Sequence, residues 1–379
     1  MAERLLTPSK ISAWLECAHS LSLANQVDAG QLTLDPVGRG SLAEVLIDKG
    51  TEHERSCLAD LDNQGREVYH VPGRNPGEAF DAWVARVAGA LDDGHDVLYQ
   101  MPFIHDGIRG IADFVWRVNH DDGPTYEPVD AKLTRLEGKP GHVLQLCFYV
   151  DALEAATGRR PRNMHLWLGS GAVETLAVEQ FRPYWRRLQR QLRELLAREA
   201  PVTSSPLPCS HCEICEFASR CDAQWRAEDS LVYVANIRAS ERVALEGSGV
   251  TTIADLAVHE GPVALIHEEN FQRLQRQAHL QVTTRADHEA TPAFEIVEAT
   301  NDPVYGHGFE LMPEADGGDV YFDFEGHPFW RADHDLFFLA GLFYAQGGEW
   351  AYDGRWAHDL EEQDAMIAEL TDFFARRRN

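Results

Sequence analysis

The sequence predicts an α/β protein whose core is a mixed sheet flanked by helices. Between two apolar runs stands Asp106-Gly107, a dipeptide typical of a tight hairpin turn between strands. Residues 77–92 instead repeat apolar side chains at helical spacing, with Phe80 and Trp83 on one face. At 379 residues, the chain is long enough for two or three domains with cores of their own.

The composition is that of a soluble globular protein, with 44% hydrophobic and 25% charged residues. No window approaches about 18 consecutive apolar residues, so we expect no transmembrane helix. The N-terminal sequence MAERLLTPSK lacks an apolar signal core, which predicts a cytoplasmic protein. The net charge of −27 excludes binding to nucleic acid by general electrostatic attraction, so any such binding must depend on local basic patches and metal ions.

The N-terminal elements are expected to be helices. Apolar residues at helical spacing predict a helix over residues 11–27, which Ser9 can cap and which contains Cys17. Residues 43–60 form a second helical stretch that includes His53. A histidine on a helix is usually a surface residue, so its spacing alone assigns no role to His53.

Three strands are expected to bring charged residues together. The hairpin at Asp106-Gly107 carries Asp113 on its second strand. The third strand, within TYEPVDAKLTR, places Asp130 beside Asp113 and alternates Asp130 with Lys132 on one face. Glu127 lies on the same strand and is a weaker candidate.

Further helices and strands complete the predicted core. A helix over 141–158 carries Gln145 and Tyr149 on one face, and strands follow at 164–170 and 172–178. A long helix from about 179 to 199 then places arginines at six positions of an acidic chain. Either a solvated face or a face that follows a phosphate backbone explains this helix. The arginines are Arg182, Arg186, Arg187, Arg190, Arg193 and Arg198.

Clustered cysteines predict a metal site. In a chain without a secretion signal, such cysteines are typical metal ligands rather than disulfide partners. A proline-rich loop this short cannot bury a core, so a metal would organise it. One possibility is a local zinc site, with His211 as a possible further ligand. The clustered cysteines are Cys209, Cys212, Cys215 and Cys221.

The remainder of the chain predicts two more units. Two short helical runs around Gly247-Ser248-Gly249 indicate either an ordinary helical hairpin or a helix-hairpin-helix whose turn binds phosphate. A later strand alternates Asp323 with Glu325, and a β-hairpin and a helix follow it. We find no G-x-x-x-x-G-K-[ST] phosphate-binding loop.

The charged residues of the three strands fit one kind of chemistry. Carboxylates supply the hard oxygen ligands that Mg²⁺ and Mn²⁺ prefer. The metal lowers the pKa of an attacking water, and a lysine orients that water or offsets charge in the transition state. Asp113, Asp130 and Lys132 therefore predict a metal-dependent phosphodiesterase.

The order of these motifs resembles RecB-family nucleases of the PD-(D/E)xK superfamily over roughly residues 1–225. The resemblance implies a restriction-endonuclease-like core, a metal held by three residues, and an (D/E)-x-K lysine assisted by two helix residues. It thus implies a Mg²⁺- or Mn²⁺-dependent deoxyribonuclease acting on single-stranded DNA or DNA ends, in DNA repair or recombination. The metal residues are His53, Asp113 and Asp130, and the other catalytic residues are Lys132, Gln145 and Tyr149.

More narrowly, the chain looks like RecB-like nucleases that join an iron–sulfur nuclease domain to an RNase H-like (DEDD) domain. This resemblance implies a [4Fe–4S] cluster held by Cys17, Cys212, Cys215 and Cys221, which ties the first helix to the end of the nuclease domain. Only Asp323-x-Glu325 matches the DEDD pattern, so the second domain looks truncated.

The expected domains are therefore a nuclease domain at 1–228, a helical linker domain at 229–290 and a partial RNase H-like domain at 291–379. DNA is the expected partner, and no membrane is involved. The rival hypothesis is a non-catalytic DNA-binding module that serves a helicase partner.

Overall fold

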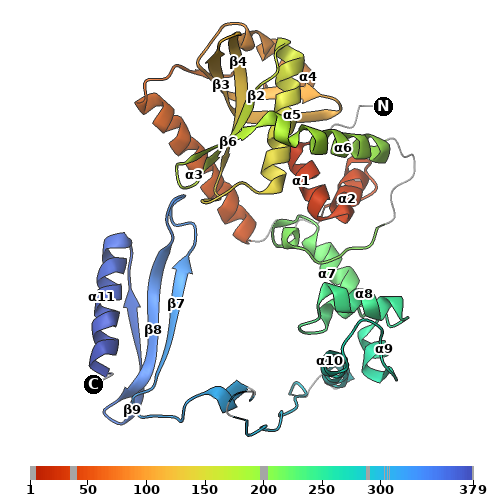
Figure 1. Cartoon of the computed structure of the whole chain (residues 1–379), viewed down its shortest axis with the longest axis vertical. Coiled ribbons are helices and arrows are strands. Elements are labelled where there is room, and N and C mark those ends of the chain that lie inside the picture. The colour runs from red at the N-terminus through yellow and green to blue at the C-terminus, as the bar shows by residue number, and fades with distance from the viewer. Residues whose placement is uncertain are drawn as a thin grey trace. The chain divides into compact units, whose positions relative to one another are not determined.

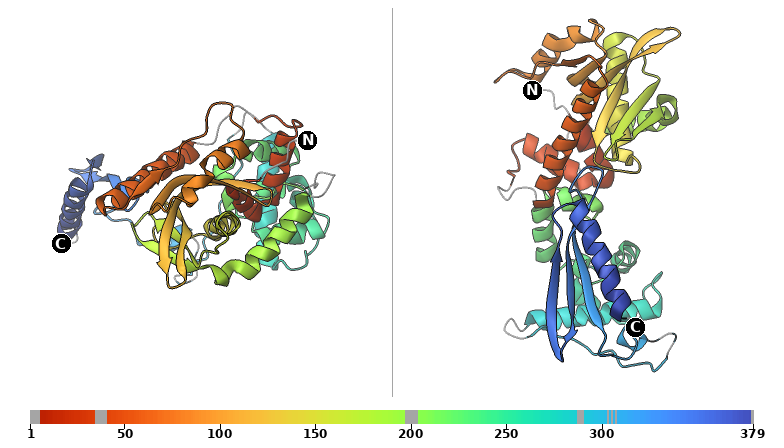
Figure 2. Two further views of the ribbon diagram at one scale, coloured as in Figure 1. Left: turned by 90° about the horizontal axis from the view of Figure 1, so that it is seen from above. Right: turned by 90° about the vertical axis from the view of Figure 1, so that its left-hand side faces the viewer.

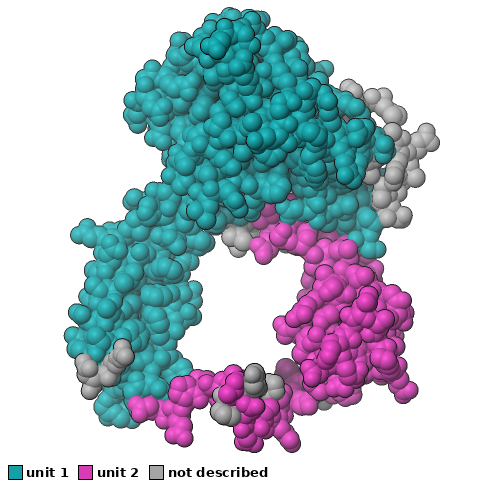
Figure 3. Space-filling model, viewed as in Figure 1, with its two compact units in different colours: residues 1–205, 317–379 teal, residues 206–316 magenta. Residues whose placement is uncertain are grey.

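The computed structural model describes residues 6–34, 41–196, 204–286, 291–302, 304, 306 and 308–377. The chain divides into two compact units (Figure 3): residues 1–205 with 317–379, and residues 206–316. Residues 206–228, which we expected in the nuclease domain, are thus grouped with the helical segment that follows them. Among the described residues, no helix is both long and apolar enough to span a membrane.

The first unit is built on a mixed sheet with the order β1-β2-β3-β4-β5-β6 (Figure 1). The pairs β2–β3, β3–β4 and β5–β6 are antiparallel, whereas β1–β2 and β4–β5 are parallel. The predicted mixed sheet is therefore confirmed. Its strands are β1 Val68–His70, β2 Val97–His105, β3 Ile108–His120, β4 Gly123–Lys132, β5 Asn163–Leu168 and β6 Val173–Ala177.

Helices cover both faces of this sheet, as the view from above in Figure 2 shows. On one face, Leu146 and Leu153 of α5 pack in the main core against Leu98 of β2. On the other face, Cys57 of α3 packs against Phe114 of β3. The helices of this part are α1 Pro8–Glu16, α2 Ala18–Asp28, α3 Ser41–Asn63, α4 Phe80–Val87, η1 Ala88–Leu91, α5 Pro140–Thr157 and α6 Val178–Leu196.

The hairpin turn forms where the sequence predicts it. Asp106 and Gly107 both have positive φ, at 49° and 74°. A turn with two such residues matches the twist of the flanking strands, and aspartate followed by glycine adopts it at low cost. The turn fixes the register of β3 against β2, which begins with Ile108 opposite His105.

The N-terminal helix differs from the prediction in two respects. It breaks at Cys17, whose extended backbone (φ −145°, ψ 99°) ends α1 and begins α2. The hydroxyl of Ser20 donates to the Cys17 carbonyl at 2.8 Å, which stabilises the start of the second helix. Thr7 rather than Ser9 caps α1, because its side chain accepts from the Lys10 N–H and Pro8 then fits the first turn.

The second unit is helical around a small core of its own, which contains Leu245, Ile253 and Leu274. The predicted helical hairpin is present as α8 and α9, joined through Ser248 and Gly249. The elements are η2 Ser210–Ile214, α7 Ala218–Ala227, η3 Leu231–Tyr233, α8 Ala239–Gly247, α9 Ile253–Val258, α10 Glu268–Ala286 and η4 Gly308–Leu311.

The C-terminal part of the first unit is an antiparallel sheet of order β7-β8-β9 with one helix. Ala340 and Leu342 of β8 pack against Met366 and Leu370 of α11. The β-hairpin and helix predicted from the sequence are therefore present. The elements are β7 Val320–His327, β8 Leu336–Gln346, β9 Glu349–Trp356 and α11 Leu360–Arg377.

Candidate active site

Asp113 and Asp130 meet at the centre of the six-stranded sheet. The antiparallel register of β3 and β4 places them side by side, and Asp113 Oδ2 accepts the Ala131 N–H at 2.9 Å. Burial, and after it the neighbouring Asp130 carboxylate, raise the pKa of Asp113 to about 7. Two carboxylates held this close repel each other when both are charged, so the pair attracts a cation.

Lys132 supplies a positive charge to this pair. Its Nζ lies 2.8 Å from Asp130 Oδ2. Burial disfavours the ammonium, but the Asp130 and Asp113 carboxylates outweigh burial and raise the pKa of Lys132. Lys132 is therefore charged at neutral pH, and it is suited to stabilise negative charge rather than to accept a proton.

The oxygens of Asp130 are unusual for so deeply buried a group. Only 1% of the residue is exposed. The groups that meet them are themselves ionisable: the Lys132 ammonium pairs with Oδ2, and the Asp113 carboxyl group hydrogen-bonds the Asp130 side chain. A carboxylate offers about four lone pairs, so lone pairs remain for coordinating a metal ion.

A third carboxylate, Glu54 of α3, lies beside the pair, and the sequence did not single it out. Gln100 and Tyr99 hydrogen-bond its carboxyl group. Burial, and then the charge of Asp113, raise the pKa of Glu54. In the sequence, Glu54 directly follows His53 in GTEHE, and this position is the only feature that could have pointed to it.

His53 lies on the buried side of the same helix. Its Nε2 is 3.1 Å from the Trp167 carbonyl, and Cys57 Sγ lies 3.7 Å from the same nitrogen. Only 5% of the residue is exposed. If Nε2 donates to the Trp167 carbonyl, Nδ1 is the nitrogen with a lone pair. Its role as a metal ligand stays a prediction.

Gln145 and Tyr149 project from α5 towards the strand that carries Asp113. The Tyr149 hydroxyl donates to the Ile111 carbonyl at 2.5 Å, two residues before Asp113. Gln145 also hydrogen-bonds Tyr149. Burial, and then the Asp130 and Asp113 carboxylates, raise the pKa of Tyr149 well above its usual value, so its hydroxyl stays protonated. Through these hydrogen bonds, Gln145 and Tyr149 are suited to hold β3, the strand that carries Asp113, in position.

Glu127 is separated from the pair. It is an odd number of residues from Asp130, so its side chain lies on the opposite face of β4. Glu127 Oε2 is 2.9 Å from His165 Nε2, and Oε1 accepts the Asn163 N–H at 3.0 Å. Burial opposes ionisation, but these hydrogen bonds and the nearby histidines outweigh it and lower the pKa of Glu127. Glu127 is thus a structural carboxylate.

This lowered pKa makes a prediction about stability. A folded-state pKa below the ordinary 4.5 means that the charged form stabilises the fold. Glu127→Gln should lower the free energy of unfolding by about 1–3 kcal/mol at pH 7. The contribution is complete above pH 4.5 and is lost as the pH falls through the folded-state pKa, so the difference should shrink below pH 4. Denaturant unfolding of both proteins at several pH values measures it, with the exposed Asp121→Asn as control; an equal loss at every pH would contradict the assignment.

The predicted cysteine ligands are distributed over both units. Cys209 and Cys212 have sulfurs 3.9 Å apart, Cys215 Sγ accepts the Phe217 N–H at 3.4 Å, and Cys221 is buried on α7. Cys17 belongs to the other unit. Among the described residues, no three or more His, Cys, Asp or Glu side chains are arranged so that they could hold a metal ion together. This holds for the cysteines and also for the carboxylates around Asp113.

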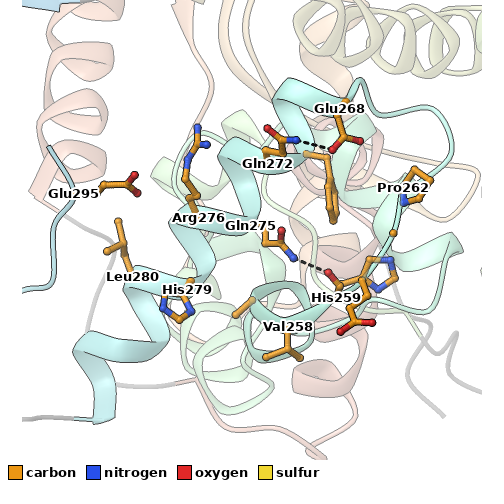
Figure 4. A pocket seen from close by; sticks show the side chains of 14 residues that line it. Val258, His259, Pro262, Glu268, Gln272, Gln275, Arg276, His279, Leu280 and Glu295 are labelled. Atoms are coloured by element: carbon orange, nitrogen blue, oxygen red, sulfur yellow. Dashed lines mark hydrogen bonds between the residues drawn. The ribbon is translucent and has the colours of Figure 1, made fainter. Parts of the chain in front are cut away.

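Two other features lie apart from the pair. Asp323 and Glu325 are exposed on β7. A cavity of about 740 Å³ in the second unit is lined by residues of α10 and of the segment after α9, among them His259, Arg276 and His279 (Figure 4). None of the predicted site residues belongs to its lining.

Residues 39–222 match the family model of the PD-(D/E)XK nuclease superfamily. No curated protein is similar enough to the chain to match it. The matched range contains the paired carboxylates, Lys132 and the helix of Glu54, and its mixed sheet flanked by helices is the architecture expected of that superfamily. Residues 39–222 of this chain form a PD-(D/E)XK nuclease superfamily domain.

Proposed function

We propose that the chain is a deoxyribonuclease that uses Mg²⁺ or Mn²⁺ to hydrolyse phosphodiester bonds in single-stranded DNA or at DNA ends, in DNA repair or recombination. One observation carries the proposal: two adjacent buried carboxylates, Asp113 and Asp130, lie beside the charged Lys132, which pairs with Asp130.

The residues present fit a divalent cation. Mg²⁺ usually keeps several waters and is bound through one or two protein carboxylates together with substrate phosphates, so it does not require a ready-made group of three ligands. Asp113 and Asp130 would hold it, with Glu54 and the predicted ligand His53 beside them. When bound, the cation supplies an activated water and neutralises charge on the phosphate.

The chain's own residues then have separable tasks. The Lys132 ammonium offers a hydrogen-bond donor and a positive charge to the phosphate oxygens as charge develops on them. Tyr149 holds the strand before Asp113 through the Ile111 carbonyl, and Gln145 holds the Tyr149 hydroxyl. The backbone N–H of Ala131 donates to one oxygen of Asp113. This hydrogen bond holds the Asp113 carboxylate in its orientation beside Asp130.

The test of this proposal is cleavage of labelled oligonucleotides in Mn²⁺, with and without a chelator. A nuclease releases shorter products only when the cation is present. A non-catalytic module serving a helicase would retain the DNA uncut under both conditions, and that result would contradict the proposal.

The position of Glu54 makes a further prediction. Glu54→Gln removes a negative charge beside Asp113 while keeping the acceptor for Gln100, so cleavage should fall by about 10- to 100-fold. Higher Mn²⁺ concentrations should recover part of this loss. Glu52→Gln, on the same helix but 62% exposed in its side chain, is the matched control and should cleave normally. Equal activity in both variants would remove Glu54 from the site.

We also propose a [4Fe–4S] cluster held by Cys17, Cys212, Cys215 and Cys221, with a local zinc site of Cys209, Cys212, Cys215 and Cys221 as the alternative. The support is the chemistry of the thiols and their spacing. Residues 291–379 are proposed as part of an RNase H-like domain, which rests on Asp323 and Glu325 alone.

A further inference from the structure

The outer face of α6 is basic, and the inner face fixes its orientation. Trp185, Leu188 and Leu192 are buried in the main core. The Trp185 indole N–H and the Gln189 amide both donate to Asp151 Oδ2, at 2.7 and 3.0 Å. Because these contacts hold the helix against α5, its opposite face is presented to solvent.

Three arginines on this outer face form no ion pair with any described residue. Arg182 pairs with Glu179 at 3.1 Å and Arg193 with Asp106 at 2.6 Å. Of the other four arginines predicted here, Arg198 lies outside the described residues, and the remaining three are exposed. In a chain with 61 acidic and 34 basic residues, three neighbouring exposed arginines without an ion pair form a local concentration of positive charge. The unpaired residues are Arg186, Arg187 and Arg190.

The spacing of these residues suits a nucleic-acid strand. Arg186 and Arg190 are one helical turn apart, which puts their Cβ atoms about 5–6 Å from each other. Tyr184, 56% exposed, lies three residues before Arg187 on the same side of the helix. Arginines that follow a backbone beside an aromatic ring that stacks on a base are the usual elements of single-strand binding.

The helix is also joined to the strand that carries Asp113. Arg193 donates to Asp106 in the turn between β2 and β3, and this turn leads directly into β3. Through Trp185 and Gln189, α6 packs against α5 in the same compact unit as β3. A strand bound along α6 is therefore held by the same rigid part of the fold that positions the paired carboxylates.

We propose that the exposed face formed by Arg186, Arg187 and Arg190, with Tyr184 at its edge beside Arg187, binds the phosphate backbone of a single-stranded DNA substrate outside the Asp113–Asp130 site. The identity of the partner rests on the proposed function. The net charge of −27 makes the chain as a whole repel DNA. This surface provides a local concentration of unpaired positive charge that can attract the phosphate backbone.

The experiment measures binding of the full chain to a fluorescent oligothymidine, without divalent cation so that nothing is cut, over a range of salt concentrations. Changing Arg186, Arg187 and Arg190 together to glutamine should reduce the slope of log K against log salt by about 2, since each lost phosphate contact removes about 0.7 from the slope on a single strand. Tyr184→Ala should weaken binding by about tenfold with the slope unchanged.

The matched control is Arg182→Gln, which removes a charge of the same helix that is already paired with Glu179. An unchanged slope in the triple variant, an equal loss in the control, or no measurable binding by the unaltered chain would each overturn the surface. Failure of the proposed nuclease gives a different result: the slope falls as expected in the binding assay, but no product forms when Mn²⁺ is added.

Discussion

Replacing Asp130 with asparagine is expected to reduce DNA cleavage by about 10³-fold or more while leaving the fold intact. Asparagine has the same shape but lacks the charge that balances a cation and Lys132. The change also removes the repulsion that raises the pKa of Asp113. Because the change also breaks the ion pair with Lys132, the loss of cleavage is measured under conditions in which the variant is fully folded.

Single-turnover cleavage of a labelled oligonucleotide in Mn²⁺ measures this loss, and denaturant unfolding measures stability in the same preparations. Asp323→Asn is a suitable control because this carboxylate is exposed on β7 and far along the chain from the pair. Normal cleavage by Asp130→Asn would remove the central residue from the proposed mechanism.

Loss of the proposed [4Fe–4S] cluster is the second large effect we expect. Anaerobically purified protein should contain iron and acid-labile sulfide, with little zinc. Cys17→Ala should release both and destabilise the nuclease domain by several kcal/mol, because metal binding contributes directly to folding. The break between α1 and α2 leaves Cys17 at a helix junction, partly exposed, where a thiolate can serve as a ligand.

Cys209→Ala distinguishes the two metal sites. A [4Fe–4S] cluster that uses Cys17 should survive this change, whereas a zinc site built from neighbouring cysteines should not. Stoichiometric zinc without sulfide, together with normal stability of Cys17→Ala, would contradict the cluster. Metal analysis and thermal unfolding of the two variants decide the question.

The paired carboxylates could be predicted because strand patterns encode them locally. The turn at Asp106-Gly107 sets the hairpin, and the two-residue period of β4 places Asp130 and Lys132 on one face. The same period excludes Glu127 from that face. These features depend on a few neighbouring residues, so the sequence was sufficient.

Glu54 could not be predicted in this way. Its place beside Asp113 depends on which face of α3 packs against the sheet, and that is decided by Cys57 and Leu61 in the core under α3. The break at Cys17 was missed for a related reason: apolar spacing continues through it, while the break depends on the backbone of one residue.

The most direct test of the account is a calorimetric titration of Mn²⁺ into the chain without DNA, at pH 8. We expect Asp113 and Asp130 together to bind a cation, this binding to be lost in Asp130→Asn, and it to be retained in Asp323→Asn with Glu325→Gln. Equal Mn²⁺ binding by the unaltered chain and Asp130→Asn would contradict it.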